Sequence, residues 1–117
     1  MMDGPAYHLV ILPQAEADIR AGHAYLAEHS SEAATRWVRL VKAAMSSLEE
    51  MPLRAPTAPE AEKLGFPLRQ LLYGQRPGVY RIVFRVLEVE REVHVLTVRH
   101  SARRPFSVDE MELFLEL

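Results

Sequence analysis

The spacing of apolar residues differs between the two main parts of this 117-residue chain, and that difference restricts the fold to a mixture of helices and strands. From residue 14 to about residue 51, apolar residues recur every three or four positions, which is the spacing of one face of a helix. After residue 67 they alternate with other residues, most clearly from Tyr80 to Val86, as in a β-strand. The intervening stretch, 52–67, contains four prolines and is predicted to be a loop.

The first part of the chain predicts a strand followed by two helices. A β-rich run over 7–12 ends at Pro13, which suits the first position of a helix because its missing N–H would have no partner there. Ser30 and Ser31 are typical N-cap residues, and the apolar spacing after them extends to about Met51. Two consecutive helices with so short a link predict an antiparallel hairpin.

The second part predicts three strands, over 68–73, 79–87 and 93–99, with turns at 74–78 and 88–92. We expect an antiparallel sheet with one face on the helical hairpin and the other carrying arginines. Ser107 and Glu110 form a capping-box pattern that predicts a short tail helix. The order strand, two helices, three strands, helix is an α+β fold. The length predicts one domain spanning residues 1–117, with a core at about 7–106 and the tail helix over 107–117.

Composition excludes several classes of protein and site. The chain has no cysteine, so it holds no disulfide scaffold, thiolate metal site or cysteine nucleophile. Its five histidines are scattered, and no glycine-rich phosphate loop is present, so we predict neither a metal nor a cofactor. Without an apolar run of about 18 residues or a signal-peptide pattern, we expect a cytoplasmic protein that does not contact the membrane.

Positive charge is concentrated in the strand half. The net charge is −2, but residues 68–104 contain eight arginines, three glutamates and no lysine, which gives +5. Arg81 and Arg85 project from the same face of one predicted strand. This face either binds an anion or target, or is a solvated surface with ion pairs to nearby glutamates. The candidate target-binding or anion-binding residues are Arg69, Arg81, Arg85, Arg99, Arg103 and Arg104.

The loop after the last predicted strand contains charged and titratable side chains that could take part in binding or catalysis. Histidine is the side chain best suited to proton exchange at physiological pH, so His100 could exchange protons, while Arg103 and Arg104 could hold an anion. The alternative is a basic loop that pairs with the acidic tail, since residues 105–117 contain four acids and no base.

Five segments, in order, resemble the RelE/ParE superfamily, the toxins of bacterial type II toxin–antitoxin modules, also known as plasmid stabilisation proteins. The resemblance covers roughly residues 7–106 and is carried by Leu12–Ile19, Leu48–Pro52, Pro67–Leu71, Val79–Phe84 and Val95–Arg103. It implies a toxin that arrests growth and is neutralised by a cognate antitoxin. RelE-type members are mRNA interferases that cut messages on the ribosome, whereas ParE-type members inhibit DNA gyrase.

A few residues of this sequence help to decide between the nuclease branch and the gyrase-inhibitor branch. Arg81 matches the arginine that the nucleases carry in their Tyr-Arg strand, and Arg103 matches the arginine of their final loop. The nuclease lysines before the sheet are poorly matched, and the tail has no tyrosine. If the protein is an enzyme, His100 must replace that tyrosine, and the catalytic residues are Arg81, His100 and Arg103. The missing tyrosine favours the gyrase inhibitor; the mRNA endonuclease and a non-toxic binding domain with the same fold are the alternatives.

The resemblance also implies a partner surface. Antitoxins of this superfamily wrap their toxin with an extended, partly helical segment. A sheet edge could accept a strand, and the apolar stripe of the hairpin could accept a helix. Trp37 and Val41 are the candidate antitoxin contacts, although core packing explains the same stripe. The tail helix could fold back on the sheet or mediate a homodimer.

Overall fold

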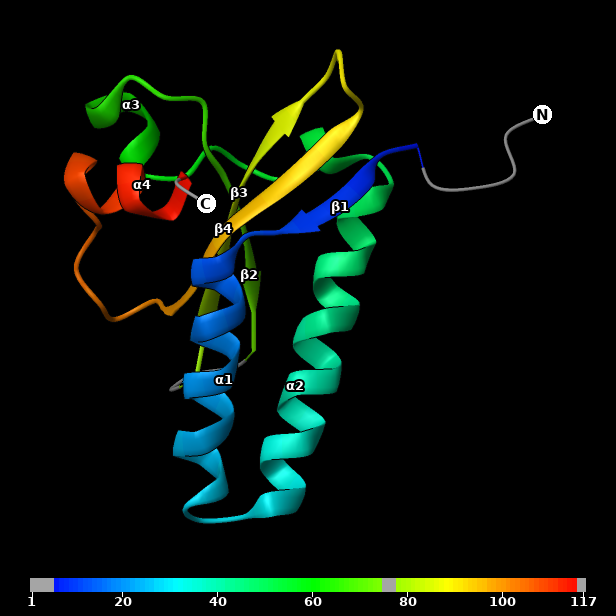
Figure 1. Ribbon diagram of the computed structural model, residues 1–117, viewed down its shortest axis with the longest axis vertical. Coiled ribbons are helices and arrows are strands. Elements are labelled where there is room, and N and C mark those ends of the chain that lie inside the picture. The colour runs from blue at the N-terminus through cyan, green and yellow to red at the C-terminus, as the bar shows by residue number, and fades with distance from the viewer. Residues whose placement is uncertain (1–5, 75–77, 116–117) are drawn as a thin grey trace.

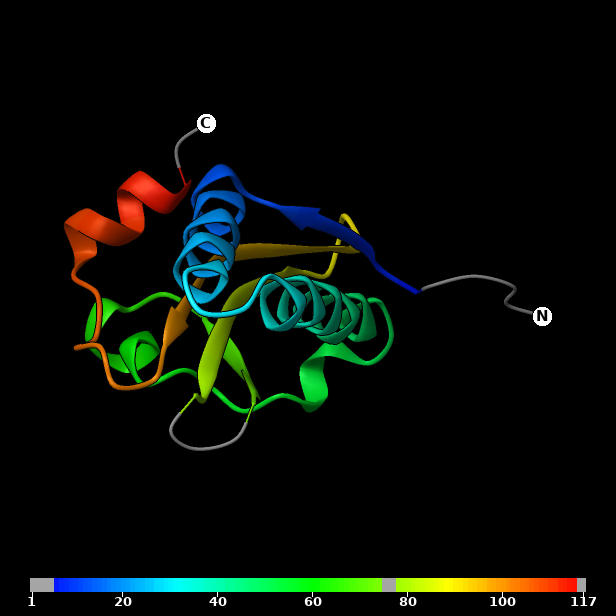
Figure 2. The same cartoon turned by 90° about the horizontal axis from the view of Figure 1, so that it is seen from below.

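The computed structural model describes residues 6–74 and 78–115, which form a sheet with helices on both of its faces (Figure 1, Figure 2). The order of strands and long helices confirms the predicted α+β fold. The elements are β1 (His8–Ile11), α1 (Pro13–Ala27), α2 (Ser31–Ser46), α3 (Glu60–Leu64), β2 (Arg69–Tyr73), β3 (Tyr80–Leu87), β4 (Glu92–His100) and α4 (Val108–Leu115).

The four-stranded sheet has the order β1-β4-β3-β2. The predicted antiparallel pairing holds for β2 with β3 and for β3 with β4. Strand β1, however, pairs in parallel with β4, from His8 opposite Glu92 to Ile11 opposite Val95, so the whole sheet is mixed. Because β1 and β4 are separated by most of the chain, no local turn signal predicts how they pair.

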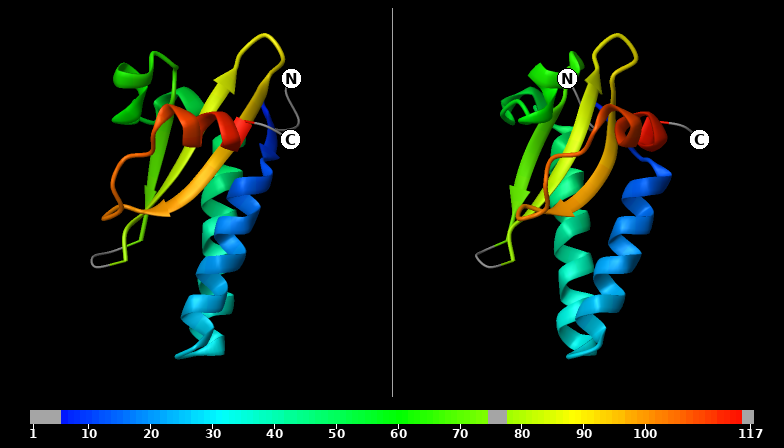
Figure 3. Two further views of the ribbon diagram at one scale, coloured as in Figure 1. Left: turned by 60° about the vertical axis from the view of Figure 1, so that its left-hand side comes forward. Right: turned by 90° about the vertical axis from the view of Figure 1, so that its left-hand side faces the viewer.

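Helices α1 and α2 lie side by side as the expected hairpin in every view (Figure 1, Figure 3). Ser30 is the N-cap of α2, and its hydroxyl accepts a hydrogen bond from the Ala33 amide at 3.1 Å. Near the middle of α1, Gly22 allows Trp37 of α2 to come very close, because a Cβ at Gly22 would lie 2.4 Å from the Trp37 ring. The helices therefore pack tightly where the chain has its smallest residue.

The proline-rich stretch 52–67 is more structured than a loop. It contains a 3₁₀ turn over Pro52–Arg54 and the five-residue helix α3. Pro59 occupies the N-cap position of α3, and Gly65 ends it with a left-handed φ of 63°. Prolines before a helix do not interrupt its hydrogen bonds, so the proline count was misleading here. The predicted turn around Pro77 lies outside the described residues.

Two hydrophobic clusters share the sheet. The first joins the hairpin to the sheet and includes Ile82 and Phe84 of β3. The second includes Val83, which alternates with them and so faces the other way. It is closed by residues of α3, α4 and the loop between β4 and α4, among them Ala61, Phe106, Met111 and Phe114. The arginine-bearing face is therefore covered and not solvated. No helix among the described residues is long and apolar enough to cross a membrane.

Candidate functional site

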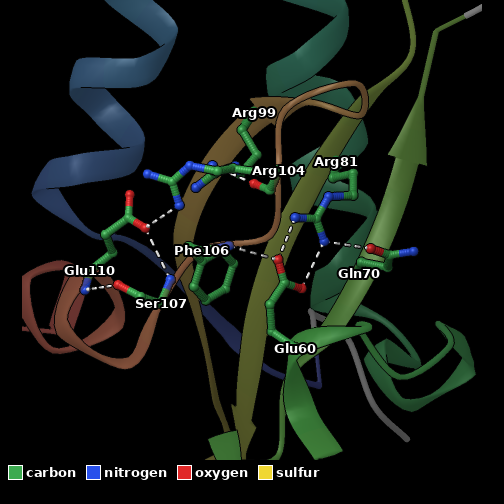
Figure 4. Close-up of polar contacts among 8 residues, drawn as sticks. All are labelled: Glu60, Gln70, Arg81, Arg99, Arg104, Phe106, Ser107 and Glu110. Atoms are coloured by element: carbon green, nitrogen blue, oxygen red, sulfur yellow. Dashed lines mark hydrogen bonds and ion pairs between the residues drawn. The ribbon is translucent and has the colours of Figure 1, made fainter. Parts of the chain in front are cut away.

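Arg81 of β3 lies at the centre of the covered face. Its residue surface is only 6% exposed. The guanidinium donates to both carboxylate oxygens of Glu60 in α3, at 2.9 and 2.6 Å, and to the side-chain oxygen of Gln70 in β2 at 2.9 Å (Figure 4). This bidentate pair ties α3 to the sheet and uses the donors that would otherwise bind an external anion.

Glu60 connects a third element to the same pair. Its carboxylate also accepts a hydrogen bond from the backbone amide of Phe106, at 3.3 Å, in the loop before α4. Burial by itself raises the pKa of Glu60, but the hydrogen bond from Arg81, the bond from its own backbone amide, the charge of Arg81 and the bond from the Phe106 amide together outweigh it and hold the pKa below its ordinary value. Glu60 is thus an ionised, buried link between the sheet, α3 and the C-terminal segment.

Arg99 of β4 is buried beside this link, with 3% of its surface exposed. It donates to the backbone carbonyl of Arg104 at 2.9 Å and lies over the Phe106 ring, 5.4 Å from the ring centre. Burial, with the positive charge of Arg103 nearby, lowers its pKa. Among the described residues no carboxylate forms an ion pair with Arg99.

Two of the other predicted arginines also make internal contacts. Arg69 donates to the carbonyls of Leu53 and Ala55, at 3.2 and 2.7 Å, and so fixes the segment before α3. Arg85 lies over the ring of Phe66, 5.5 Å from its centre. Of the six arginines proposed as a binding face, only Arg103 and Arg104 are exposed.

The segment from Arg103 to Glu110 carries the exposed positive charge of this region. Ser107 and Glu110 form the predicted capping box: the Ser107 amide donates to the Glu110 carboxylate and the Glu110 amide to the Ser107 hydroxyl. The bond from the Ser107 amide lowers the pKa of Glu110. Arg104 lies 3.6 Å from the same carboxylate. The pairing of the basic loop with the acidic tail, which was the alternative to an anion-binding loop, is therefore present at Arg104.

His100 lies on the other side of the sheet from Arg81. It is paired with Tyr80 across the β3–β4 ladder, and the two rings are 5.3 Å apart. Tyr80 in turn packs on Trp37 of the hairpin, at 5.2 Å between ring centres. Because Arg81 follows Tyr80 in the strand, the two side chains point to opposite faces. The three residues predicted for catalysis are therefore not brought together.

The two residues proposed as antitoxin contacts have different environments. Val41 is completely buried in the cluster beneath the hairpin, so it is a core residue and cannot reach a partner in this conformation. Trp37 is half-buried, over Gly22 and beside Tyr80. Core packing thus explains the apolar stripe at Val41, while part of Trp37 stays accessible.

The outer edge of β2 is partly open. Residues 56–58 pair with its beginning: the Gln70 amide donates to the Pro56 carbonyl, and the Ala58 amide to the Leu68 carbonyl. Within the described residues no backbone bond continues this pairing beyond Gln70. Leu72, farther along the strand, is 55% exposed. An incoming strand could therefore bind there.

Three important residues were not identified from the sequence. Glu60 and Gln70 hold Arg81, and Asp18 of α1 accepts hydrogen bonds from the Thr97 hydroxyl and the Val98 amide where β1 no longer covers β4. The local signals for Asp18 were its position four residues after Gln14 on one helix face and its place in the Leu12–Ile19 segment that carries the family resemblance. No three His, Asp or Glu side chains in the described part of the chain gather as a metal site.

Comparison with known proteins agrees with this architecture. The family model described as the ParE toxin of the type II toxin–antitoxin system parDE matches residues 9–105. A solved chain titled as the chromosomal ParDE TA system from P. aeruginosa has a similar fold, with a TM-score of 0.61, 18% identity and coverage of 83% of this chain and 98% of that chain. None of the curated proteins compared with the chain matches it. Since the family model spans most of the sequence, the chain belongs to the ParE toxin family of type II toxin–antitoxin systems.

Proposed function

We propose that this protein arrests growth by binding and inhibiting DNA gyrase in the cytoplasm, and that a cognate antitoxin neutralises it. The observation that supports this best is the state of Arg81. The arginine that a nuclease of the superfamily would need is buried and bound to Glu60, and His100 lies across the sheet from it. Membership of the ParE family supports the same choice.

The cost of freeing Arg81 favours a binding protein over a nuclease. To reach an RNA phosphate, Arg81 would have to leave the Glu60 carboxylate buried and unpaired. Breaking such a pair costs about 3–5 kcal/mol. Catalytic charges are normally held in place before the substrate arrives, so a site with this cost is poorly prepared for RNA cleavage.

We assign the gyrase contact to the exposed loop that carries Arg103 and Arg104. Both side chains are exposed, while Arg81 and Arg99 beneath them are buried and stabilise the loop from below. Exposed arginines on a supported loop are suited to a protein surface rich in carboxylates. The other four arginines would then act by holding the scaffold.

For the antitoxin, the open end of the β2 edge is the surface that fits best. An extended segment could pair with β2 beyond Gln70 and cover Leu72. The structural neighbour from P. aeruginosa is titled as a toxin–antitoxin system, which supports a similar partner here.

The test is a gyrase supercoiling assay with the purified wild-type protein and two double variants. We expect the wild type to inhibit supercoiling, and the double variant R103A/R104A to require at least about tenfold more protein, as expected for loss of two interface arginines. The matched control R36A/R39A removes two exposed arginines from α2 and should inhibit like the wild type. Equal potency of both double variants would overturn the loop assignment.

RNA profiling after induction separates the alternatives. Cleavage of translated messages at full gyrase activity would overturn the proposal in favour of an mRNA endonuclease. Normal growth, with active gyrase and intact messages, would instead indicate a non-toxic binding domain.

A further inference from the structure

A cavity of about 800 Å³ lies between α3 and the start of α4. We call it the α3–α4 groove. Its apolar walls include Leu64 on one side and Pro105 and Val108 on the other, and Phe106 contributes to its inner surface. Figures 1 and 3 show both helices at the same end of the molecule, away from the link of the hairpin. The volume lies within the range of about 300–1,000 Å³ that is typical of small-molecule sites.

The exposed charges that line the groove are both positive. Lys63 of α3 and Arg104 of the loop lie on its rim, and both are exposed. The one acid in the lining, Glu60, is 3% exposed, and its charge is balanced by the bidentate bond from Arg81. A ligand would therefore meet an apolar surface bordered by two cations.

The side chains drawn in Figure 4 beside the α3–α4 groove also include more cations than anions. Figure 4 shows Arg99 and Arg104 beside the Arg81–Glu60 pair, with Glu110 as the second carboxylate of the group. Arg99 is buried, and no described carboxylate pairs with it. An added negative charge at the Arg104 side of the groove would reduce the repulsion among these arginines.

We propose that the α3–α4 groove binds a small organic acid that has one carboxylate and an apolar body of aromatic or branched aliphatic type. The carboxylate lies between Lys63 and Arg104, and the apolar body packs on Leu64 and Val108. Such a ligand contacts both α3 and the segment at the start of α4, which together cover Arg81 and Arg99. Its binding therefore keeps these two segments packed on the sheet. The groove shares Arg104 with the loop that we assign to gyrase, but binding of the acid also uses Lys63, Leu64 and Val108 and does not depend on gyrase inhibition.

The test is a titration of the 15N-labelled full chain, followed by amide chemical shifts. The probe is 4-phenylbutyrate, and its neutral analogue is 4-phenylbutyramide. We expect saturable shifts at Lys63, Leu64, Ser107 and Val108, with a dissociation constant of about 0.1–1 mM for a ligand of this size. The neutral analogue should bind at least about fivefold more weakly, because it lacks the charge.

Three single variants separate the groove from non-specific association. Lys63→Gln should weaken binding of the acid about threefold or more, as expected for a charge near the surface. Lys42→Gln removes the other lysine of the chain, which is exposed on α2, and should change nothing. Glu110→Gln should strengthen binding, since it frees Arg104 while glutamine can still complete the capping box.

Several results would overturn the proposal. Shifts that stay linear up to about 10 mM, equal binding of acid and amide, or equal effects of the two lysine variants would each exclude this site. A blocked peptide, acetyl-Glu-Phe-amide, that binds more tightly than 4-phenylbutyrate would show that the groove takes a polypeptide segment and not a small acid. The folded state of every variant is checked in the same spectra, so unfolding cannot be mistaken for lost binding.

Discussion

At the scale of single residues, the Arg81–Glu60 pair decides what the covered face can do. We predict that Glu60→Ala lowers the free energy of unfolding by about 3–5 kcal/mol, because Arg81 is left buried without a carboxylate. Urea denaturation followed by circular dichroism measures the loss. The double variant E60L/R81M replaces both charges by apolar groups and should recover most of it. A loss below about 1 kcal/mol in Glu60→Ala would contradict this role.

Asp18 has a comparable role at the edge of the sheet. Its carboxylate accepts the amide of Val98, which β1 does not reach, and the hydroxyl of Thr97. We predict that Asp18→Ala costs about 1–3 kcal/mol, since a partly buried amide and hydroxyl lose their acceptor. Hydrogen exchange at Val98 should accelerate, whereas Glu28→Ala, at the exposed end of the same helix, should leave it unchanged. Unaltered exchange in Asp18→Ala would show that another group caps this edge.

These two carboxylates show where prediction from the sequence fails at this scale. The arginine pattern and the capping box at Ser107 are visible because their members lie within a few residues of one another. Glu60 is 21 residues from Arg81, and Asp18 is 79 from Thr97. No rule of sequence spacing connects the residues of these two pairs. The sequence could therefore place the arginines on one face of a strand but could not identify their carboxylate partners.

At the scale of elements, the packing of the hairpin depends on Gly22. Helix propensity alone predicts that Gly22→Ala stabilises α1 by about 1 kcal/mol. The structure predicts the opposite, because the new Cβ would lie 2.4 Å from the ring of Trp37. We expect a net loss of about 1–3 kcal/mol from overpacking, with a changed tryptophan fluorescence spectrum.

The control for Gly22→Ala is Trp37→Phe. The three closest atoms all belong to the six-membered part of the indole, which phenylalanine lacks at that position. In the Trp37→Phe background, Gly22→Ala should therefore cost little or should stabilise the chain. An equal cost in both backgrounds would mean that the penalty does not come from the ring.

Elements with a strong periodic pattern were predictable, and those that depend on distant contacts were not. The hairpin and the three antiparallel strands follow from local spacing, and their observed bounds differ by a few residues at most, apart from the end of α2. The predicted second helix reached about Met51, but α2 ends at Ser46 and a 3₁₀ turn follows. Helix α3 is too short to show a period, and the parallel pairing of β1 depends on a strand far along the chain.

At the scale of the whole molecule, the sheet separates two environments with different roles. One face holds the apolar core under the hairpin, and the other holds buried charge under α3, α4 and the loop between β4 and α4. A charged core of this kind makes stability sensitive to acid, because Glu60 must stay ionised to bind Arg81 and the Phe106 amide. The fold and its response to pH are therefore linked through one carboxylate.

The sign of this dependence follows from the lowered pKa of Glu60. A glutamate in the unfolded chain has a pKa of about 4.3, and in the folded protein the pKa of Glu60 is lowered. The stabilisation is therefore complete above about pH 4.3 and is lost as the pH falls through the folded pKa. Glu110 contributes with the same sign, because its pKa is also lowered. We expect the free energy of unfolding to fall as the pH drops below about 4.3, more steeply in the wild type than in E60L/R81M, which keeps Glu110. Identical slopes in the two proteins would mean that Glu60 is not the carboxylate that links stability to pH.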